Sequence, residues 1–473
     1  MAKAKDFIVG LGLLGSGTVG EAIQDLVFAA GNRKEPGLRL KIAKIYTRRP
    51  DTGHPKKKKW YTTHRELFTT NPTEVIDHPE ADIIIEALGS EDERDLATFK
   101  GYIIRALGNG KSVVTSDKAV LARFGQEIWE AAARSGQEIR FEACVGGGIP
   151  IIRALTQSFA AETPEAIYGI INGTSNYILS EMDKYGKSYA QALREAQERG
   201  YAETNPKSDV SGLDAEAKLM LLAGVTFGLH MSPGGVWRKG IEEIHPVDFL
   251  YASRKGRSTI KPLAVARSDG STVEALVAPA LVPHDHFLAA IDGATNAILF
   301  KGQKSAAGDR EDKSEIRGWN YAFVGPGAGG GPTAVAVMGD VWELARGARE
   351  HGAGFPSLVA PGTLAVQSQA RISACFYVRF VVKDRVGIVA DICQAFGQAG
   401  INVSEIWQLG HSQEELENLH RSYRLDVKPR EILPFVITLE RATVGQMTAA
   451  LAAIRRKDYI LVEPVWLPIW GTG

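Results

Sequence analysis

Cysteine is scarce in this sequence, which has three cysteines in 473 residues, Cys144, Cys375 and Cys393. An odd number of cysteines without a Cys-x-x-Cys spacing provides neither a disulfide framework nor a cysteine-based zinc site. Free thiols persist in reducing compartments, so we expect a cytoplasmic protein.

Long apolar segments and an excess of one charge are also missing. The sequence has no uninterrupted run of about 18 apolar residues, which argues against a membrane-spanning helix, and its first residues lack the pattern of a signal peptide. The 55 basic and 55 acidic side chains cancel, so the charge balance does not favour nucleic acid as a partner. The lysine run 56–59 is interpreted as a solvated loop.

The composition that is present, 44% hydrophobic and 23% charged, is that of a globular protein, and the length predicts about three domains. Strand-like and helix-like segments alternate through residues 1–145. This alternation predicts a Rossmann-like, doubly wound parallel sheet, completed by a later segment at about 325–348. The expected strands are 7–14, 40–46, 81–88, 112–115 and 139–142, with a helix at 19–30.

The remainder of the chain divides into three further parts. Residues 146–324 mix strands with helices, expected at 151–161, 189–199 and 214–229, and predict an α+β domain for substrate binding and dimerisation. Residues 349–370 are rich in Gly, Pro and Ser and predict a linker. Residues 371–473 predict a small ferredoxin-like module with the order ββαββαβ and one weak member. A long polar insertion interrupts it at about 411–432.

A glycine-rich turn follows the first strand. Two Gly-x-Gly-x-x-Gly frames overlap, at 10–15 and 15–20, and the second precedes the apolar-periodic helix. That frame would present backbone amides to a pyrophosphate at a helix N-terminus, although glycine-rich turns are common in other settings. The dinucleotide-binding candidates are Gly15, Gly17, Thr18, Val19 and Gly20.

The end of the second strand bears on the choice of cofactor. An NAD site usually offers a carboxylate to the ribose 2′-OH, but here Thr47-Arg48-Arg49-Pro50 precedes the first acid, Asp51. A guanidinium suits a 2′-phosphate. Arg48 therefore favours NADP(H), with NAD(H) left open because both arginines could be ordinary loop charges.

The run from Gly200 to Lys218 holds three candidate carboxylates, Glu203, Asp209 and Asp214, and the candidate lysine Lys218, besides Glu216 and Lys207. Asp214 and Lys218 are four residues apart and share one helix face, while Glu203 and Asp209 precede that helix. An isolated pair of this kind is usually a surface ion pair. Here an apolar run, 219–225, continues the helix, which is atypical of a solvated helix.

These segments together resemble the homoserine dehydrogenase family. Residues 196–218 match its signature A-x3-G-Y-x-E-x-(D/N)-P-x2-D-(V/L)-x-G-x-D-x3-K without a gap. Further family-like segments follow one another in the expected order, at 82–89, 110–119, 142–152, 171–178, 325–329 and 332–334. The C-terminal module resembles an ACT domain through 383–392 and 400–404, but Val386 replaces the usual proline.

The resemblance implies nicotinamide-linked interconversion of L-homoserine and L-aspartate 4-semialdehyde. Lys218 matches the family's proton donor, and Lys118 matches a lysine beside the cofactor and the substrate carbonyl. Glu203 and Asp214 are expected to hold the substrate ammonium group, and Asp209 to orient the lysine or the substrate. Gly200 and Gly329 match positions at the cofactor.

The resemblance also implies a monovalent cation, usually sodium, held by Glu142 and by carbonyls at Val145, Gly147 and Ile149. The alternative interpretation is that glycines 146–148 only form a tight turn between two domains. The segment 172–176 either lines the pocket or caps a helix through Ser175 or Asn176.

Competing interpretations remain at this stage. Prephenate and phosphoglycerate dehydrogenases also join Rossmann and ACT domains, but neither explains residues 196–218. A nonenzymatic sensor of dinucleotide and amino acid would need no lysine in its pocket. An ACT effector such as threonine, and a homodimer or homotetramer, are expected by analogy only.

Overall fold

The computed structural model describes residues 6–28, 36–48, 58–90, 92–303, 320–351 and 364–471. By its internal contacts the chain forms two compact units. Unit 1 comprises Met1–Ile167, Ala217–Pro233 and Asn296–Ala365; unit 2 comprises Tyr168–Glu216, Gly234–Thr295 and Val366–Gly473. Each unit is described by itself.

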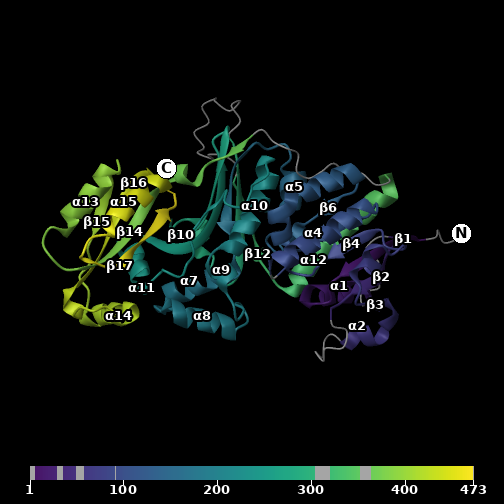
Figure 1. The fold of residues 1–473 in the computed structure, drawn as a ribbon, viewed down its shortest axis with the longest axis horizontal. Helices are drawn as coiled ribbons and strands as arrows, with labels where there is room; N and C mark the ends of the chain where they lie inside the picture. The colour runs from purple at the N-terminus through teal and green to yellow at the C-terminus, as the bar shows by residue number, and fades with distance from the viewer. Residues whose placement is uncertain are drawn as a thin grey trace. The chain divides into compact units, whose positions relative to one another are not determined.

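Unit 1 is built on a six-stranded parallel sheet with the order β3-β2-β1-β4-β5-β6 (Figure 1). Its strands are β1 (Phe7–Leu14), β2 (Leu38–Tyr46), β3 (Phe68–Thr69), β4 (Ile83–Glu86), β5 (Ser112–Thr115) and β6 (Ile139–Arg140). Strands β2 and β3 lie on one side of β1, and β4, β5 and β6 lie on the other. The switch point, at which doubly wound folds bind ligands, is therefore between β1 and β4. The Rossmann-like prediction is thereby confirmed.

Helices connect these strands. They are α1 (Thr18–Phe28), α2 (Lys58–Thr63), α3 (Pro72–Ile76), α4 (Glu93–Gly108), α5 (Lys118–Ser135) and the single turn α6 (Ile151–Arg153), followed by a π-helical turn, Ala154–Ser158. The predicted strand 139–142 is shorter, since a 3₁₀ turn begins at Glu142.

A late segment closes the core of unit 1. The helix α12 (Gly330–His351) packs beside α1. Its Val337, Val341 and Trp342 join one apolar cluster with Leu11 and Leu13 of β1. The strands β7 (Pro164–Ile170), β11 (Thr295–Gly302) and β12 (Asn320–Pro326) lie side by side in the order β12-β11-β7.

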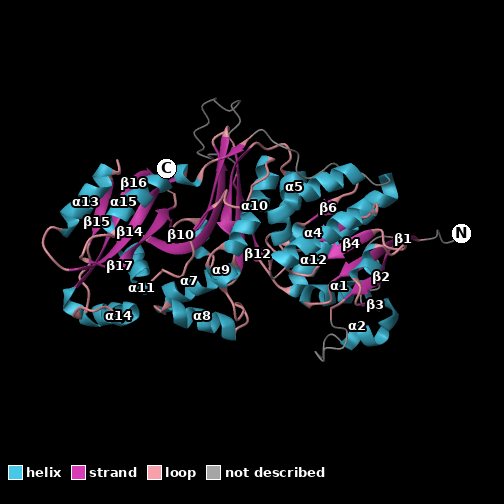
Figure 2. Ribbon diagram, viewed as in Figure 1, coloured by secondary structure: helices cyan, strands magenta, loops and turns pink. Residues whose placement is uncertain are grey.

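Unit 2 contains a mixed sheet with the order β9-β10-β17-β14-β16-β15 (Figure 2). β10 pairs antiparallel with β9 and parallel with β17. The strands are β8 (Trp237–Arg238), β9 (Ser258–Ser268), β10 (Thr272–Pro283), β14 (Ser373–Lys383), β15 (Val403–Trp407), β16 (Ile432–Thr443) and β17 (Ile460–Ile469). The helices are α7 (Gly173–Tyr185), α8 (Tyr189–Glu198), α9 (Lys207–Val210), α11 (Pro246–Arg254), α13 (Ile388–Gln398), α14 (Gln413–Tyr423) and α15 (Val444–Ile454).

The C-terminal module departs from the predicted order. From β14 onward it reads β14-α13-β15-α14-β16-α15-β17, so the predicted order ββαββαβ is wrong at its start. The short strand β13 (Ala365–Val366) pairs with β10 instead of the module. The polar insertion folds as α14, which a capping box at Ser412 and Glu415 begins.

Within the parts of the chain that the structure describes, no helix combines the length and the apolarity needed to cross a bilayer.

Candidate active site

The glycine turn of unit 1 lies between the end of β1 at Leu14 and the start of α1 at Thr18. Gly15 has φ +114°, and a Cβ there would lie 2.4 Å from the carbonyl oxygen of Ala87. A Cβ on Gly20 would lie 2.1 Å from the Gly15 oxygen, whereas one on Gly17 would meet nothing within 4 Å. The first and third glycines therefore permit close packing, and the second leaves open space where a pyrophosphate approaches in this fold.

A second glycine-rich segment, residues 325–331, packs against the same turn. A Cβ on Gly330 would lie 2.7 Å from the Thr18 Cγ2 atom, and Gly329 has φ +116°. Both predicted cofactor segments therefore meet at the N-terminus of α1, within unit 1.

Arg48 follows β2 and is bound to a residue that the sequence did not single out. Its Nη2 donates a hydrogen bond to Asp95 Oδ1 at 3.1 Å, and its guanidinium carbon lies 5.7 Å from the centroid of the Phe99 ring. The predicted neighbours Arg49 and Asp51 lie outside the described residues.

Two buried carboxylates tie the carboxyl ends of β4 and β5 together. Glu86 accepts hydrogen bonds from the Leu88 amide at 2.8 Å and the Thr115 hydroxyl at 2.5 Å. Burial, and then the neighbouring Asp117, raises the pKa of Glu86 to about 7. Asp117 caps α5 at the amides of Ala119 and Val120, so Lys118 begins a firmly anchored helix.

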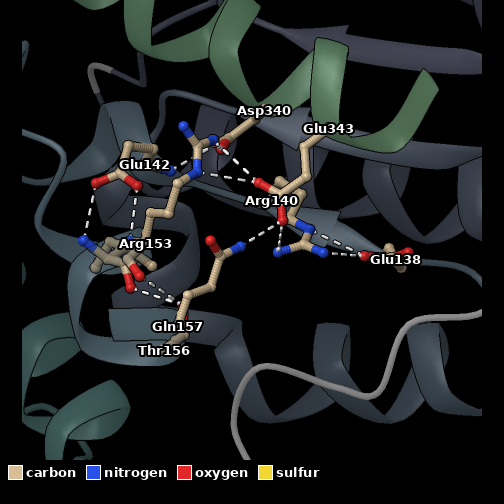
Figure 3. A network of polar contacts seen from close by, with 9 residues as sticks. Glu138, Arg140, Glu142, Arg153, Thr156, Gln157, Asp340 and Glu343 are labelled. Atoms are coloured by element: carbon tan, nitrogen blue, oxygen red, sulfur yellow. Dashed lines mark hydrogen bonds and ion pairs between the residues drawn. The ribbon is translucent and has the colours of Figure 1, made fainter. Parts of the chain in front are cut away.

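A larger polar network surrounds Glu142 (Figure 3). Its carboxylate accepts the backbone amides of Ile152 and Arg153 at 2.8 and 2.9 Å, and its own amide donates to Asp340 Oδ2 at 2.9 Å. The Arg153 guanidinium contacts Asp340 at 3.2 Å and Glu343 at 3.1 Å. Burial raises the pKa of Glu142, and burial together with Glu142 raises the pKa of Asp340 to about 7.

The predicted cation ligands lie in the loop that follows Glu142. Gly147 is left-handed with φ +57°, and the Ile149 carbonyl accepts the Ile151 amide at 2.8 Å. Each carboxylate or carbonyl oxygen has a second lone pair, so these hydrogen bonds leave the oxygens of Glu142 and Ile149 able to accept a further partner. No cluster of three or more His, Cys, Asp or Glu suited to a metal occurs in the described ranges.

Lys218 is carried by α10 (Leu213–Phe227), which starts directly after Gly212 with φ +81°. Asp214 and Lys218 are 9% and 8% exposed. The alternative of a surface ion pair on a solvated helix is therefore excluded, because both charged side chains are buried. Lys218 and Lys118 belong to unit 1, and Asp214 to unit 2.

Asn172 is the centre of the acidic cluster in unit 2. Its Nδ2 donates to Asp209 Oδ1 and to Asp214 Oδ2, both at 2.8 Å. Its Oδ1 accepts the Ser175 amide at 2.8 Å and caps α7. The alternative of a cap at Ser175 or Asn176 is wrong, because the preceding Asn172 caps the helix. The same Asn172 side chain also hydrogen-bonds both carboxylates.

Glu203 lies in the exposed connection between α8 and α9. The Gln197 side chain donates to the Glu203 carbonyl oxygen at 3.1 Å, and Gly200 turns the chain with φ +75°. The structure thus joins Asp209 and Asp214 through one side chain, and leaves the Glu203 carboxylate accessible to solvent.

Comparison with known families gives three matches. A model described as homoserine dehydrogenase matches residues 150–342, and one described as homoserine dehydrogenase, NAD binding domain, matches residues 15–142. A model described as ACT domain matches residues 376–411.

Individual relatives agree with these matches. A homoserine dehydrogenase of Mycobacterium leprae is 37% identical over 411 residues, which cover 85% of this chain and 87% of that protein. One of Pseudomonas aeruginosa is 32% identical over 459 residues, 96% of each. The crystal structure of a homoserine dehydrogenase from Thiobacillus denitrificans superposes with a TM-score of 0.82 at 30% identity, covering 98% of this chain and 99% of that one.

Proposed function

This chain belongs to the homoserine dehydrogenase family and is an oxidoreductase with a nicotinamide cofactor; we propose that it interconverts L-homoserine and L-aspartate 4-semialdehyde with NADP(H) preferred. One observation carries the assignment of the chemistry. A buried lysine, Lys218, stands one helical turn after a buried carboxylate, Asp214, which Asn172 holds by a 2.8 Å hydrogen bond.

The bound nicotinamide supplies or accepts the hydride, and the chain supplies the proton and the positive charge. Lys218 is the proton donor to the carbonyl oxygen of the semialdehyde in the reducing direction. Lys118 stabilises negative charge that develops on the same oxygen. Its place at the start of α5, which Asp117 caps, limits the movement of that charge.

The acidic side chains hold the other end of the substrate. Glu203 and Asp214 bind the α-ammonium group of homoserine, since two carboxylates complement one cation. Asp209 orients the substrate or the lysine, and its hydrogen bond from Asn172 at 2.8 Å supports a fixed position.

The cofactor is held by the residues of the two glycine segments. Gly15, Gly17, Thr18, Val19 and Gly20 present the N-terminus of α1 to the pyrophosphate, and Gly200 and Gly329 lie along the cofactor. Arg48 contacts the 2′-phosphate, which is the reason for the proposed NADP(H) preference over NAD(H).

A monovalent cation, such as Na⁺, is proposed to bind the oxygens of Glu142, Val145, Gly147 and Ile149 as a structural element. An amino acid such as threonine is proposed as the effector of the ACT domain. A cytoplasmic location and a homodimer or homotetramer complete the proposal.

Replacing Lys218 tests the catalytic assignment. Lys218→Ala should lower kcat by about two orders of magnitude or more, because it removes the proton donor. NADPH affinity should remain near that of the unmodified protein. The measurements are homoserine oxidation, followed by the absorbance of the reduced cofactor, and NADPH binding by fluorescence.

Lys207→Ala is the matched control, because Lys207 is exposed in the same segment and its loss should leave turnover unchanged. Retention of most of the turnover in Lys218→Ala would remove Lys218 from the chemistry. Absence of homoserine turnover in the unmodified protein with either cofactor would refute the activity itself.

A further inference from the structure

The Arg48 guanidinium is held by two residues of one helix. Asp95 and Phe99 are four residues apart on α4, and the arginine hydrogen-bonds the first and lies over the ring of the second. Asp95 is 47 residues from Arg48 in the sequence, which explains why the pattern after β2 did not indicate it. All three residues belong to unit 1.

The helix fixes Asp95 firmly. The Asp95 amide donates to Asp92 Oδ1 at 2.8 Å, where Asp92 caps the helix, and Phe99 is 2% exposed. The side chains of Arg48 and Asp95 remain 52% and 21% exposed. Phe99 lies against the guanidinium, whose N–H groups also hydrogen-bond Asp95 and the side chain of Tyr46. Since the guanidinium has five N–H donors, further donors remain for another anion.

We propose that Asp95 determines how strongly the protein discriminates NADPH from NADH, by limiting the preference for the 2′-phosphate. The proposal rests on the function proposed above, in which Arg48 meets that phosphate. The Asp95 carboxylate already balances the charge of Arg48. A phosphate monoester that binds Arg48 would therefore also lie near this negative charge. NADH carries no charge at this position, so the carboxylate does not repel it.

Two effects of Asp95 oppose each other, and their sizes decide the sign. The ion pair orders Arg48, which assists phosphate binding, but a pair this exposed contributes little. The phosphate carries nearly two negative charges at neutral pH, so repulsion from the fixed carboxylate is the larger effect. Asp95 therefore lowers the affinity for NADPH more than ordering of Arg48 raises it.

Asp95→Asn separates these effects, because the amide keeps an oxygen acceptor for Arg48 and removes the charge. The ratio of kcat/KM for NADP to that for NAD, in homoserine oxidation at low ionic strength, should rise about threefold or more. The rise should become smaller as salt is added, because salt screens the repulsion between the Asp95 carboxylate and the 2′-phosphate near the protein surface. Glu93→Gln is the matched control: it removes the same charge from the same exposed turn of α4 and should change the ratio less.

A binding measurement gives a readout that does not depend on turnover. Calorimetry on the full chain should show tighter binding of 2′,5′-ADP to Asp95→Asn, with ADP, which lacks the 2′-phosphate, unchanged. Thermal melting checks that each variant is folded.

The outcomes separate this inference from the function on which it rests. If Arg48→Ala weakens NADPH selectively but Asp95→Asn leaves the ratio unchanged or lowers it, the role of Asp95 is refuted. If Arg48→Ala weakens both cofactors equally, the proposed role of Arg48 itself fails.

Discussion

At the scale of single residues, the three glycines of the nucleotide turn have different physical roles. Gly15 has a left-handed backbone, and a Cβ atom there would lie 2.4 Å from the Ala87 oxygen. Both the backbone conformation and the lack of space therefore exclude a side chain at this position. Gly17 has open space beside its Cα atom. The same Gly-x-Gly-x-x-Gly pattern therefore serves two purposes: Gly15 and Gly20 permit close packing, and Gly17 leaves space for a ligand.

Substitution by alanine should separate these requirements. Gly15→Ala should destabilise the fold by at least 1 kcal/mol or so, because it adds a clash and an unfavourable φ. Gly17→Ala should leave the melting temperature nearly unchanged and weaken binding of the dinucleotide. Thermal melting and cofactor titration of both variants test this, and equal melting temperatures would contradict the distinction.

Residue types that carry the chemistry were predictable from the sequence, but their partners were not. The resemblance that singled out Lys218 and Asp214 is confirmed at the level of the family, and their catalytic roles stay predictions. The contacts of Asp95 and Asp340, and the bridging of Asp209 and Asp214 by Asn172, join distant segments of the chain. No local periodicity encodes such contacts, so only the folded chain reveals them.

At the scale of elements, α11 begins with an unusual capping residue. The Nδ1 atom of His245 accepts the Val247 amide at 3.2 Å, and Asp248 accepts the His245 amide at 2.8 Å. Burial, and then the nearby Arg379, lowers the pKa of His245 to about 3. A neutral imidazole is required for the cap, since the protonated ring has no acceptor.

Stability should therefore fall as the pH is lowered. Between about pH 6.5 and the folded-state pKa, the unfolded chain binds a proton at His245 that the folded chain does not. The neutral His245 therefore contributes fully to the free energy of unfolding above about pH 6.5. As the pH falls through this window, the contribution decreases by at most about 1.4 kcal/mol per pH unit. His245→Asn keeps an acceptor at the cap and should flatten the decline of melting temperature from pH 7 to 4. A decline as steep as in the unmodified protein would contradict this role.

Element boundaries show where local sequence was sufficient. The strands predicted at 7–14 and 112–115 match β1 and β5, because their apolar runs are bounded by turn residues. The helix predicted at 151–161 is instead one α turn followed by a π turn. There the Glu142 carboxylate accepts hydrogen bonds from the backbone amides of Ile152 and Arg153. Apolar periodicity does not indicate this interaction.

At the scale of the whole molecule, the C-terminal module shares its core with the preceding part of unit 2. One apolar cluster contains Phe249 and Tyr251 of α11 together with Tyr377 of β14 and Leu419 of α14. Inside it, Arg379 Nη1 contacts Asp248 Oδ2 at 2.7 Å, and both side chains are at most 1% exposed. The linker prediction at 349–370 largely falls outside the described residues.

Breaking this buried pair should be costly. Asp248→Asn leaves the Arg379 charge without its counter-ion and should cost about 3–5 kcal/mol. The double variant Asp248→Leu, Arg379→Met should recover much of the loss, because neither charge remains buried. Asp458→Asn, which breaks an exposed pair with Arg385 in the same module, is the control and should change stability little. Melting temperatures that fall equally in all three variants would contradict the special role of the buried pair.

The late position of α12 constrains how the protein can be made. The helix that covers β1 and α1 is encoded after the whole of β7, α10 and β11. A nascent chain leaving the ribosome therefore exposes the apolar side of its nucleotide-binding half until synthesis has passed His351, about three quarters of the way along the 473 residues. We therefore expect unit 1 to complete its core only after α12 has been synthesised, later than an N-terminal domain that one continuous segment encodes.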